Sequence, residues 1–258
     1  MSMESPSDGI CRRTFKRLRG FVISRFPKRL ELPARYQYRR IFGHLEKEFS
    51  ILGRLAGGGV ALDIGGNIGL YTYRLSQLCS RVEYFEPNPA SVRMIKNLRL
   101  KNVTVHNVGV SSADGTMRLY VPVVNGVRMT ELANFQGADG EHDELEVPVR
   151  RLDGLGFTGV SFIKIDVEGH ELEVLDGAEE TILRERPVMM VEIAQHHLSV
   201  PMRAVFDRVL GMGYTGYFFM DGRLHPLTGY TQETGRAPGT GRVFFNFIFI
   251  PANRQVSL

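Results

Sequence analysis

Between residues 60 and 193, short apolar runs alternate with segments in which apolar residues recur at helical spacing. The apolar runs are predicted to be β-strands and cover residues 60–64, 81–85, 103–107, 161–166 and 188–193. Helices are predicted between the first three strands, over residues 67 to about 78 and about 90 to 100. Strands that alternate with helices predict an α/β fold built on a mostly parallel sheet.

Two pairs of segments interrupt this alternation. Residues 117–121 and 145–149 alternate polar and apolar positions around a loop rich in Gly, Asn and Asp, which predicts a hairpin insertion that overhangs the ligand pocket. Residues 213–220 and 243–250 flank a loop rich in Gly, Thr and Pro, at about residues 221–241, with no helical pattern between them. We therefore expect an antiparallel pair at the edge of the sheet and a loop that acts as a lid.

The N-terminal region differs from the rest of the chain in pattern and charge. Residues 36–55 carry an apolar stripe that predicts one helix, stopped by three glycines at 57–59. Residues 11–40 hold eleven Lys and Arg against one acid, although the whole chain has a net charge of only +4. We interpret residues 1–56 as a basic helical extension, which either contacts an anionic membrane surface or acidic partner, or packs as a solvated helix on the α/β domain. A transit peptide is a further alternative, with Glu4 and Asp8 against it.

Composition adds few constraints. The chain of 258 residues is 43% hydrophobic and 23% charged, which is typical of a globular protein with a sizeable core. Its two cysteines, Cys11 and Cys79, are too few and too far apart for a disulfide framework or a C-x-x-C zinc site. They agree with a cytoplasmic location, and the longest apolar run, at 243–250, is too short to span a membrane.

A Gly-rich turn follows the first predicted strand, in the sequence V-A-L-D-I-G-G-N-I-G-L. A strand, such a turn and a helix N-terminus form a nucleotide-sized pocket, because glycines let the backbone approach a ligand and free N–H groups favour anions. We assign five residues here to ligand binding: Asp63, Gly65, Gly66, Asn67 and Gly69. An ordinary strand–helix turn with incidental glycines is the alternative interpretation.

The spacing of these glycines narrows the ligand class. It does not match G-x-G-x-x-G, which argues against a dehydrogenase, and no G-x-x-x-x-G-K-[ST] occurs in the chain. Asp63, just before the glycines, would repel a pyrophosphate but can accept hydrogen bonds from an ammonium group. S-adenosylmethionine, which has an amino-acid end, is therefore the cofactor that we expect.

Acidic residues at the next strand end strengthen this expectation. Glu86 lies 23 residues after Asp63, at the end of the neighbouring strand, where a carboxylate can accept from both hydroxyls of a ribose. Asn88, in the turn that follows, is assigned to the same pocket. Val110 and Ser111, just past the third strand, are weaker candidates for contacts with the adenine ring.

The fourth and fifth strand ends carry the candidate catalytic residues. Asp166, Glu168 and His170 follow the fourth strand, and His196 lies past the fifth. Acids and histidines gathered at neighbouring strand ends would surround a reacting group. Asp166 is our first candidate for the base, and His170 and His196 are the alternatives. A divalent metal held by Asp166, Glu168 and Glu192 is an alternative that we do not favour, and Lys164 is expected to pair with an acid.

Several stretches match one known family in its order. They read A-L-D-I-G-G-N-I-G-L-Y-T, F-E-P-N-P, N-L-R-L-K-N, R-L-D, F-I-K-I-D-V-E-G-H-E-L-E-V-L-D-G-A, P-V-M-M-V-E-I and N-F-I-F-I-P. The chain thereby resembles the FkbM-type S-adenosylmethionine-dependent methyltransferases over about residues 60–251. Gly66 departs from the family, which more often has alanine there, and the basic N-terminal region lies outside the match.

This resemblance implies a class I methyltransferase domain over residues 57–258, with a hairpin insertion at about 113–150. It implies a Rossmann-like sheet of seven strands, the last one antiparallel, with helices on both faces. It also implies methyl transfer, usually to a hydroxyl of a sugar, glycan, polyketide or other small molecule. A nucleic-acid methyltransferase is disfavoured, because no [DNS]-P-P-[YF]-like motif is present to receive a flipped base. A non-catalytic adenosyl-binding protein is a third alternative.

Overall fold

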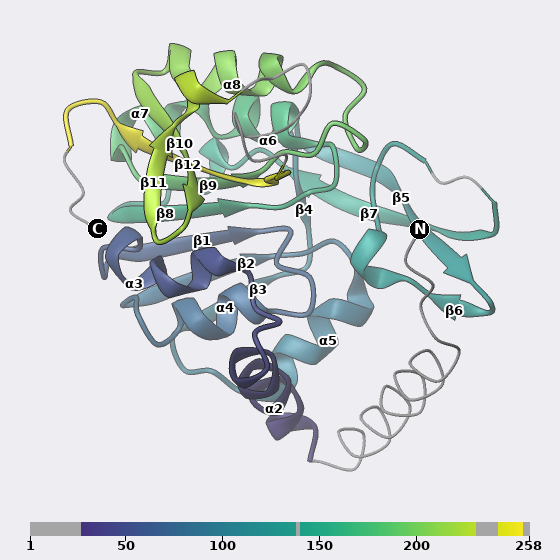
Figure 1. Ribbon diagram of the computed structural model, residues 1–258. Helices are drawn as coiled ribbons and strands as arrows, with labels where there is room; N and C mark the ends of the chain where they lie inside the picture. Colours follow the sequence, from purple (N-terminus) through teal and green to yellow (C-terminus); the bar gives the residue numbers. More distant parts are fainter. Residues whose placement is uncertain (1–26, 138–139, 231–241, 255–258) are drawn as a thin grey trace, which may run out of the picture.

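A twisted sheet of eight strands forms the centre of the molecule (Figure 1). The structure, a computed structural model, describes residues 27–137, 140–230 and 242–254. In spatial order the strands are β11 (Arg223–Pro226), β10 (Tyr214–Met220), β12 (Asn246–Pro251), β9 (Val188–Glu192), β8 (Val160–Ile165), β1 (Val60–Ile64), β2 (Arg81–Phe85) and β3 (Val103–His106). β12 runs antiparallel to both of its neighbours, while β9, β8, β1, β2 and β3 are mutually parallel. The predicted α/β fold, with its antiparallel last strand, is confirmed.

The predicted strand count and the predicted sheet edge were wrong by one strand. Residues 223–226, which we expected in a loop, form β11 and make β10 an internal strand. The cause is the two-residue turn Asp221–Gly222, in which both residues have positive φ, the geometry that turns one strand back on another. The rest of the expected lid, residues 231–241, lies outside the described residues. β12 also begins three residues later than the predicted strand.

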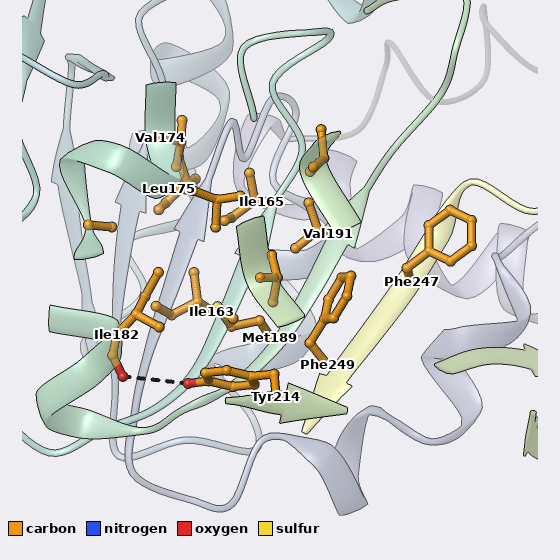
Figure 2. Packing of buried hydrophobic residues seen from close by; sticks show 14 of the residues in the cluster. Ile163, Ile165, Val174, Leu175, Ile182, Met189, Val191, Tyr214, Phe247 and Phe249 are labelled. Carbon is orange, nitrogen blue, oxygen red and sulfur yellow. Dashed lines mark hydrogen bonds between the residues drawn. The ribbon is translucent and has the colours of Figure 1, made fainter. Parts of the chain in front are cut away.

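Helices cover both faces of this sheet (Figure 1). On one face are α6 (Glu171–Gly177), α7 (Glu179–Glu185) and α8 (Met202–Gly211). On the other are α2 (Lys28–Ile41), α3 (Leu52–Leu55), α4 (Leu70–Leu75) and α5 (Pro89–Leu98). Alternate strand residues serve the two faces: Ile163 and Met189 pack toward α7 and α8 (Figure 2), whereas Phe162 and Met190 pack toward α3 and α4. Full burial on both faces explains why these strands are continuous apolar runs in the sequence.

A second, smaller sheet lies beyond the strand ends of the main sheet and contains the predicted hairpin. It is ordered β4 (Gly109–Val110), β7 (His142–Arg150), β5 (Gly115–Val124) and β6 (Val127–Arg128). β5 and β7 are antiparallel, with Leu119 opposite Leu145, and extend beyond the predicted strands at both ends. The loop after β6 reaches the turn between β8 and α6, where Gln136 Nε2 donates a hydrogen bond of 2.6 Å to the carbonyl of Gly169.

The predicted single helix over residues 36–55 was wrong. α2 ends at Ile41, and the chain continues through a 3₁₀ turn at Lys47–Ser50 into the short α3. The break is caused by Gly43, whose φ of +69° places it in the left-handed conformation, so that the His44 N–H donates to the Arg39 carbonyl at 2.8 Å. This is the bond of a Schellman helix end.

The described part of the N-terminal region packs on the α/β domain. Leu32 of α2 is buried against Val92 and Ile95 of α5, and Tyr36 meets Tyr73 edge-on, with ring centres 5.4 Å apart. The division into an extension and a domain at residue 56 stays a prediction, and residues 1–26 lie outside the described part. Within the described ranges, no helix combines the length and the apolar character needed to cross a membrane.

Candidate cofactor and catalytic site

The turn after β1 is held between the ends of two neighbouring strands. The N–H groups of Gly65 and Gly66 both donate to the Phe85 carbonyl at the end of β2, at 2.9 and 3.1 Å. On the other side, a Cβ atom added to Gly65 would lie only 1.8 Å from the Asp166 carbonyl oxygen beyond β8. Gly65 has a φ of +76°, which only glycine adopts at low cost. Gly65 is therefore required by a tight junction of three strand ends.

Glu86 is fixed beside this turn by two backbone groups. Its Oε2 accepts from the Asn67 N–H at 2.9 Å, and its Oε1 accepts from the Asn88 N–H at 2.8 Å. The Asn88 side chain caps α5 by accepting from the Ala90 N–H. Burial raises the pKa of Glu86 to about 7, although the two backbone hydrogen bonds oppose this shift. The carboxyl group is thus rigid, and it lies in the wall of a cavity.

Two cavities adjoin the turn and share Gly65, Asn67 and Asp166 in their walls. The first lies over the ends of β1 and β2 and is also lined by Glu86, Val110 and Glu168. Residues 119, 130 and 133–135 of the hairpin region cover it, as expected of an overhanging insertion. The second is lined by Asp63 and by residues 39 and 44–46 of the N-terminal region. The two cavities therefore meet at the Gly turn, one bounded by the hairpin region and the other by the N-terminal region.

Asp63 lies at the inner end of the second cavity. Its side chain is almost fully buried and accepts a hydrogen bond from the Thr72 hydroxyl of α4. Burial raises the pKa of Asp63 to about 6, while the Thr72 hydrogen bond and the charge of Lys164 act in the opposite direction.

A buried cation lies between the strand ends. Lys164 of β8 is fully buried, with Nζ 3.2 Å from Asp166 Oδ2 and 5.1 Å from the centre of the Tyr71 ring. Burial alone would lower the pKa of Lys164, but the carboxylates of Asp166, Glu192 and other nearby acids outweigh it, so the pKa is raised. The expected pairing of Lys164 with an acid is confirmed, and it holds the Asp166 carboxylate at the junction of the two cavities.

Glu168 forms a second pair that the sequence did not reveal. Its carboxylate lies 2.6 Å from Nδ1 of His197, and its φ of +50° is strained for a residue with a side chain. Burial, together with the charges of Asp166 and Glu171, raises the pKa of Glu168 to about 7. Burial also lowers the pKa of His197. Both shifts favour the uncharged forms, so these groups share a hydrogen bond near neutral pH.

Comparison with known proteins identifies the family of this chain. Residues 63–214, more than half of the chain, match the family model described as the methyltransferase FkbM domain. The chain belongs to this family. The match contains the β1 turn, Glu86, Asp166 and the Glu168–His197 pair, and it excludes the N-terminal region and β12.

This chain of the FkbM family is similar to two curated methyltransferases and to a solved structure, among others. It is 30% identical to Methyltransferase 1 of Beauveria bassiana (strain ARSEF 2860) over 144 residues, which are 46% of this chain and 58% of that protein. It is 28% identical to 2-O-methyltransferase NoeI of Sinorhizobium fredii (strain NBRC 101917 / NGR234) over 173 residues, 57% of this chain and 70% of that protein. The crystal structure of methyltransferase FkbM from Methylobacillus flagellatus KT superposes with a TM-score of 0.51 at 19% identity, over 86% of this chain and 52% of that chain.

These similarities identify the fold as the class I, Rossmann-like methyltransferase fold. The chain spans little more than half the length of the Beauveria relative and of the Methylobacillus structure.

The FkbM domain brings only some of the predicted site residues to the cavities. Asp63, Gly65, Gly66, Asn67, Glu86, Val110, Asp166 and Glu168 line one or both of the two cavities. Gly69, with a φ of +87°, instead begins α4, and Asn88 lies in the wall of a separate groove beside the hairpin. Their roles in binding stay predictions.

His170, Ser111 and His196 lie away from the two cavities. His170 Nε2 and Ser111 Oγ are 3.0 Å apart in a buried contact, and the His170 ring meets Phe135 edge-on. His196 is exposed and stacks beside His197, whose side chain points to Glu168 instead. The sequence H-H could not tell which of the two histidines turns inward. No three His, Cys, Asp or Glu side chains of the described residues are grouped so that they could hold a metal, Asp166, Glu168 and Glu192 included.

Proposed function

We propose that this protein is an S-adenosylmethionine-dependent methyltransferase that methylates a hydroxyl oxygen of a sugar, a glycan or another small molecule. The observation that carries the proposal is Glu86, held by the N–H groups of Asn67 and Asn88 in the wall of a cavity beside Gly65. Its carboxylate retains lone pairs that can accept hydrogen bonds from two ribose hydroxyls. Family membership supports the same activity.

The residues present fit this cofactor. Asn67 Oδ1 is buried and has no hydrogen-bond partner among the described residues, and Asn67 lines both cavities. A buried acceptor without a partner is costly, so a ligand that donates a hydrogen bond there would be favoured. Asp63 provides negative charge for an ammonium group, and Val110 provides an apolar wall for a purine. We therefore assign the first cavity to the adenosine and the second to the amino-acid end.

The chemistry needs a proton acceptor and exact alignment of the acceptor oxygen. The bound cofactor would supply an electrophilic methyl group. Asp166, at the junction of the cavities, would accept the proton of the acceptor hydroxyl, and Lys164, 3.2 Å away, would keep Asp166 oriented. The hydrogen-bonded Glu168 and His197 are the alternative acceptor of that proton. Attack by the acceptor oxygen would form the O–CH₃ bond as the S–CH₃ bond of the cofactor breaks, with S-adenosylhomocysteine as the leaving group, and the hydroxyl proton would go to the protein carboxylate.

The choice of a hydroxyl acceptor is supported by one relative, which is named a 2-O-methyltransferase. The cytoplasmic location and the contact with an anionic membrane stay part of the proposal. The membrane contact is supported by the exposed sequence at the end of α2, where Arg40 precedes Ile41 and Phe42, whose side chains are 71% and 57% exposed. Co-sedimentation with anionic vesicles, compared with zwitterionic ones, tests this contact, and an Ile41→Ser/Phe42→Ser variant should lose it.

Calorimetric titration with S-adenosylmethionine and S-adenosylhomocysteine tests the central proposal. We expect wild type to bind both, and Glu86→Gln to weaken binding by at least about tenfold, or about 1.4 kcal/mol. Glu83→Gln is the matched control, because Glu83 is a buried acid of the same strand that pairs with Arg81 and His106 outside the cavities. No binding by a folded wild type would refute the proposal.

Turnover separates the remaining alternatives. Release of S-adenosylhomocysteine with a hydroxylated acceptor, abolished in Asp166→Asn while cofactor binding is retained, would support the mechanism. Cofactor binding without turnover on any acceptor would favour the non-catalytic protein. Turnover on nucleic acid that falls steeply with salt would favour the nucleic-acid enzyme.

A further inference from the structure

The second cavity is completed by a segment that lies outside the family match. Arg39, His44 and Glu46 line it together with Asp63 and Asp166, yet the match begins only at residue 63. The N-terminal region therefore does more than cover the α/β domain: it forms one wall of a cavity that reaches the β1 turn. The side chains of that wall help to determine which part of a ligand the cavity accepts.

The end of α2 places two nitrogen-bearing side chains on this wall. Because Gly43 is left-handed, the chain turns back and the His44 N–H bonds to the Arg39 carbonyl at 2.8 Å. The His44 ring stacks near Tyr38, with ring centres 6.1 Å apart. Arg39 and His44 are thus brought together by the helix end itself, and both line the cavity.

Glu46 holds this segment in place. Its Oε2 accepts from the Tyr71 hydroxyl at 2.5 Å and from Asn246 Nδ2 at 2.9 Å. Tyr71 belongs to α4, directly after the Gly turn, and Asn246 begins β12. The wall is therefore fixed relative to the turn instead of being a free arm.

The walls of the cavity carry charges of both signs. Asp63 and Asp166 provide carboxylates at the strand ends, and the N-terminal wall provides the Arg39 guanidinium as well as the Glu46 carboxylate, which Tyr71 and Asn246 already engage. Arg39 is half-buried, and it makes no ion pair or side-chain hydrogen bond with any described residue, so its donors remain available. An α-amino acid carries an ammonium and a carboxylate on one carbon, which complements a cavity lined by the acids Asp63 and Asp166 and by the donors of Arg39, unpaired among the described residues.

We propose that Arg39 and His44 bind the carboxylate of the amino-acid end of the cofactor, so that the N-terminal segment completes the cofactor site. This inference rests on the proposed function, because it needs an adenosyl cofactor in the adjoining cavity. Arg39 provides a charged guanidinium that can donate two hydrogen bonds to one carboxylate, and His44 adds one ring N–H. The ammonium of the same ligand end then faces Asp63.

Two ligands that differ only in this end test the assignment. S-adenosylhomocysteine contains the amino acid, whereas 5′-methylthioadenosine keeps the adenosine and the sulfur but lacks it. Both are titrated into wild type, Arg39→Met, His44→Ala and Arg40→Met by calorimetry. Arg40→Met is the matched control, because Arg40 is the next residue of α2, is exposed, and does not line the cavity.

We expect Arg39→Met to weaken the binding of S-adenosylhomocysteine by about tenfold to about a hundredfold, and the binding of 5′-methylthioadenosine by less than about twofold. His44→Ala should show a smaller loss of the same selectivity, and Arg40→Met should bind both ligands like wild type. Unchanged S-adenosylhomocysteine affinity in Arg39→Met, or equal weakening of both ligands, would overturn the assignment while leaving the proposed function intact. Wild type that binds neither ligand would overturn both.

Discussion

Replacing Gly65 by alanine tests whether the junction of three strand ends is as tight as the structure indicates. Gly65 has a φ of +76°, and an added Cβ would lie 1.8 Å from the Asp166 carbonyl oxygen, whereas ordinary contacts begin at 3.4 Å. The left-handed conformation alone costs a non-glycine residue about 1–2 kcal/mol. Overpacking adds about 1–3 kcal/mol, because a backbone atom cannot rotate away as a side chain can. We therefore expect a total loss of about 2–5 kcal/mol.

Gly156→Ala separates the two contributions. Gly156 also has a positive φ, +65°, but an added Cβ would meet nothing within 4 Å. This variant should lose only the conformational part, about 1–2 kcal/mol. Urea unfolding gives both free energies, and calorimetry gives the affinity for S-adenosylhomocysteine, which only Gly65→Ala should lower. Equal stability losses in the two variants, with unchanged affinity, would refute the tight junction.

Three further predictions concern buried charge. Lys164→Met should destabilise by about 3–5 kcal/mol at pH 8 and by less at pH 5.5, which lies below the raised pKa values of two nearby acids, about 8 for Glu192 and about 6 for Asp63; equal loss in urea unfolding at both values would contradict this. The folded-state pKa of Glu86 is raised to about 7 from about 4.5, so folding takes up a proton between these pH values. The free energy of unfolding therefore falls as pH rises from about 4.5 to 7, and unfolding curves of Glu86→Gln should show a smaller fall across this range. Thr72→Val removes the hydroxyl that donates to Asp63 and should cost about 1–3 kcal/mol at pH 8 by urea unfolding, whereas a loss under about 0.5 kcal/mol would mean that the bond is unimportant.

The parts of the site that follow from local pattern could be predicted from the sequence. Asp63, Glu86 and Asp166 come directly after or within apolar runs, and the carboxyl ends of parallel strands meet at one edge of a sheet. The placement of these three residues at one edge of the sheet could therefore be predicted from the strand pattern alone. The pairing of Lys164 with an acid was also expected, whereas its actual partner, Asp166 just past β8, was not specified.

The features that were missed depend on single backbone angles or on distant packing. Gly43 ended α2 early, and Asp221–Gly222 turned a loop into β11, although R-I-F-G-H and D-G are recognisable signals of a helix end and a hairpin. His197 turned toward Glu168 while His196 stayed exposed, which no spacing rule distinguishes. Arg39 reached the cavity only because α2 packs on α4 and α5, a contact that no local pattern encodes.

The two hydrogen bonds that Glu46 accepts from Tyr71 and Asn246 have a consequence for the folding of the newly synthesised chain. Glu46 and Asn246 are 200 residues apart, so a ribosome synthesising the chain exposes the N-terminal segment long before β12 exists. Until β12 enters between β9 and β10, Glu46 lacks one of its two partners and the central sheet remains split. Contacts this distant in sequence form late in folding. A nascent chain that ends before β12 should therefore lack a finished cofactor pocket, so ligand-dependent protection from proteolysis would begin only when the last strand is complete.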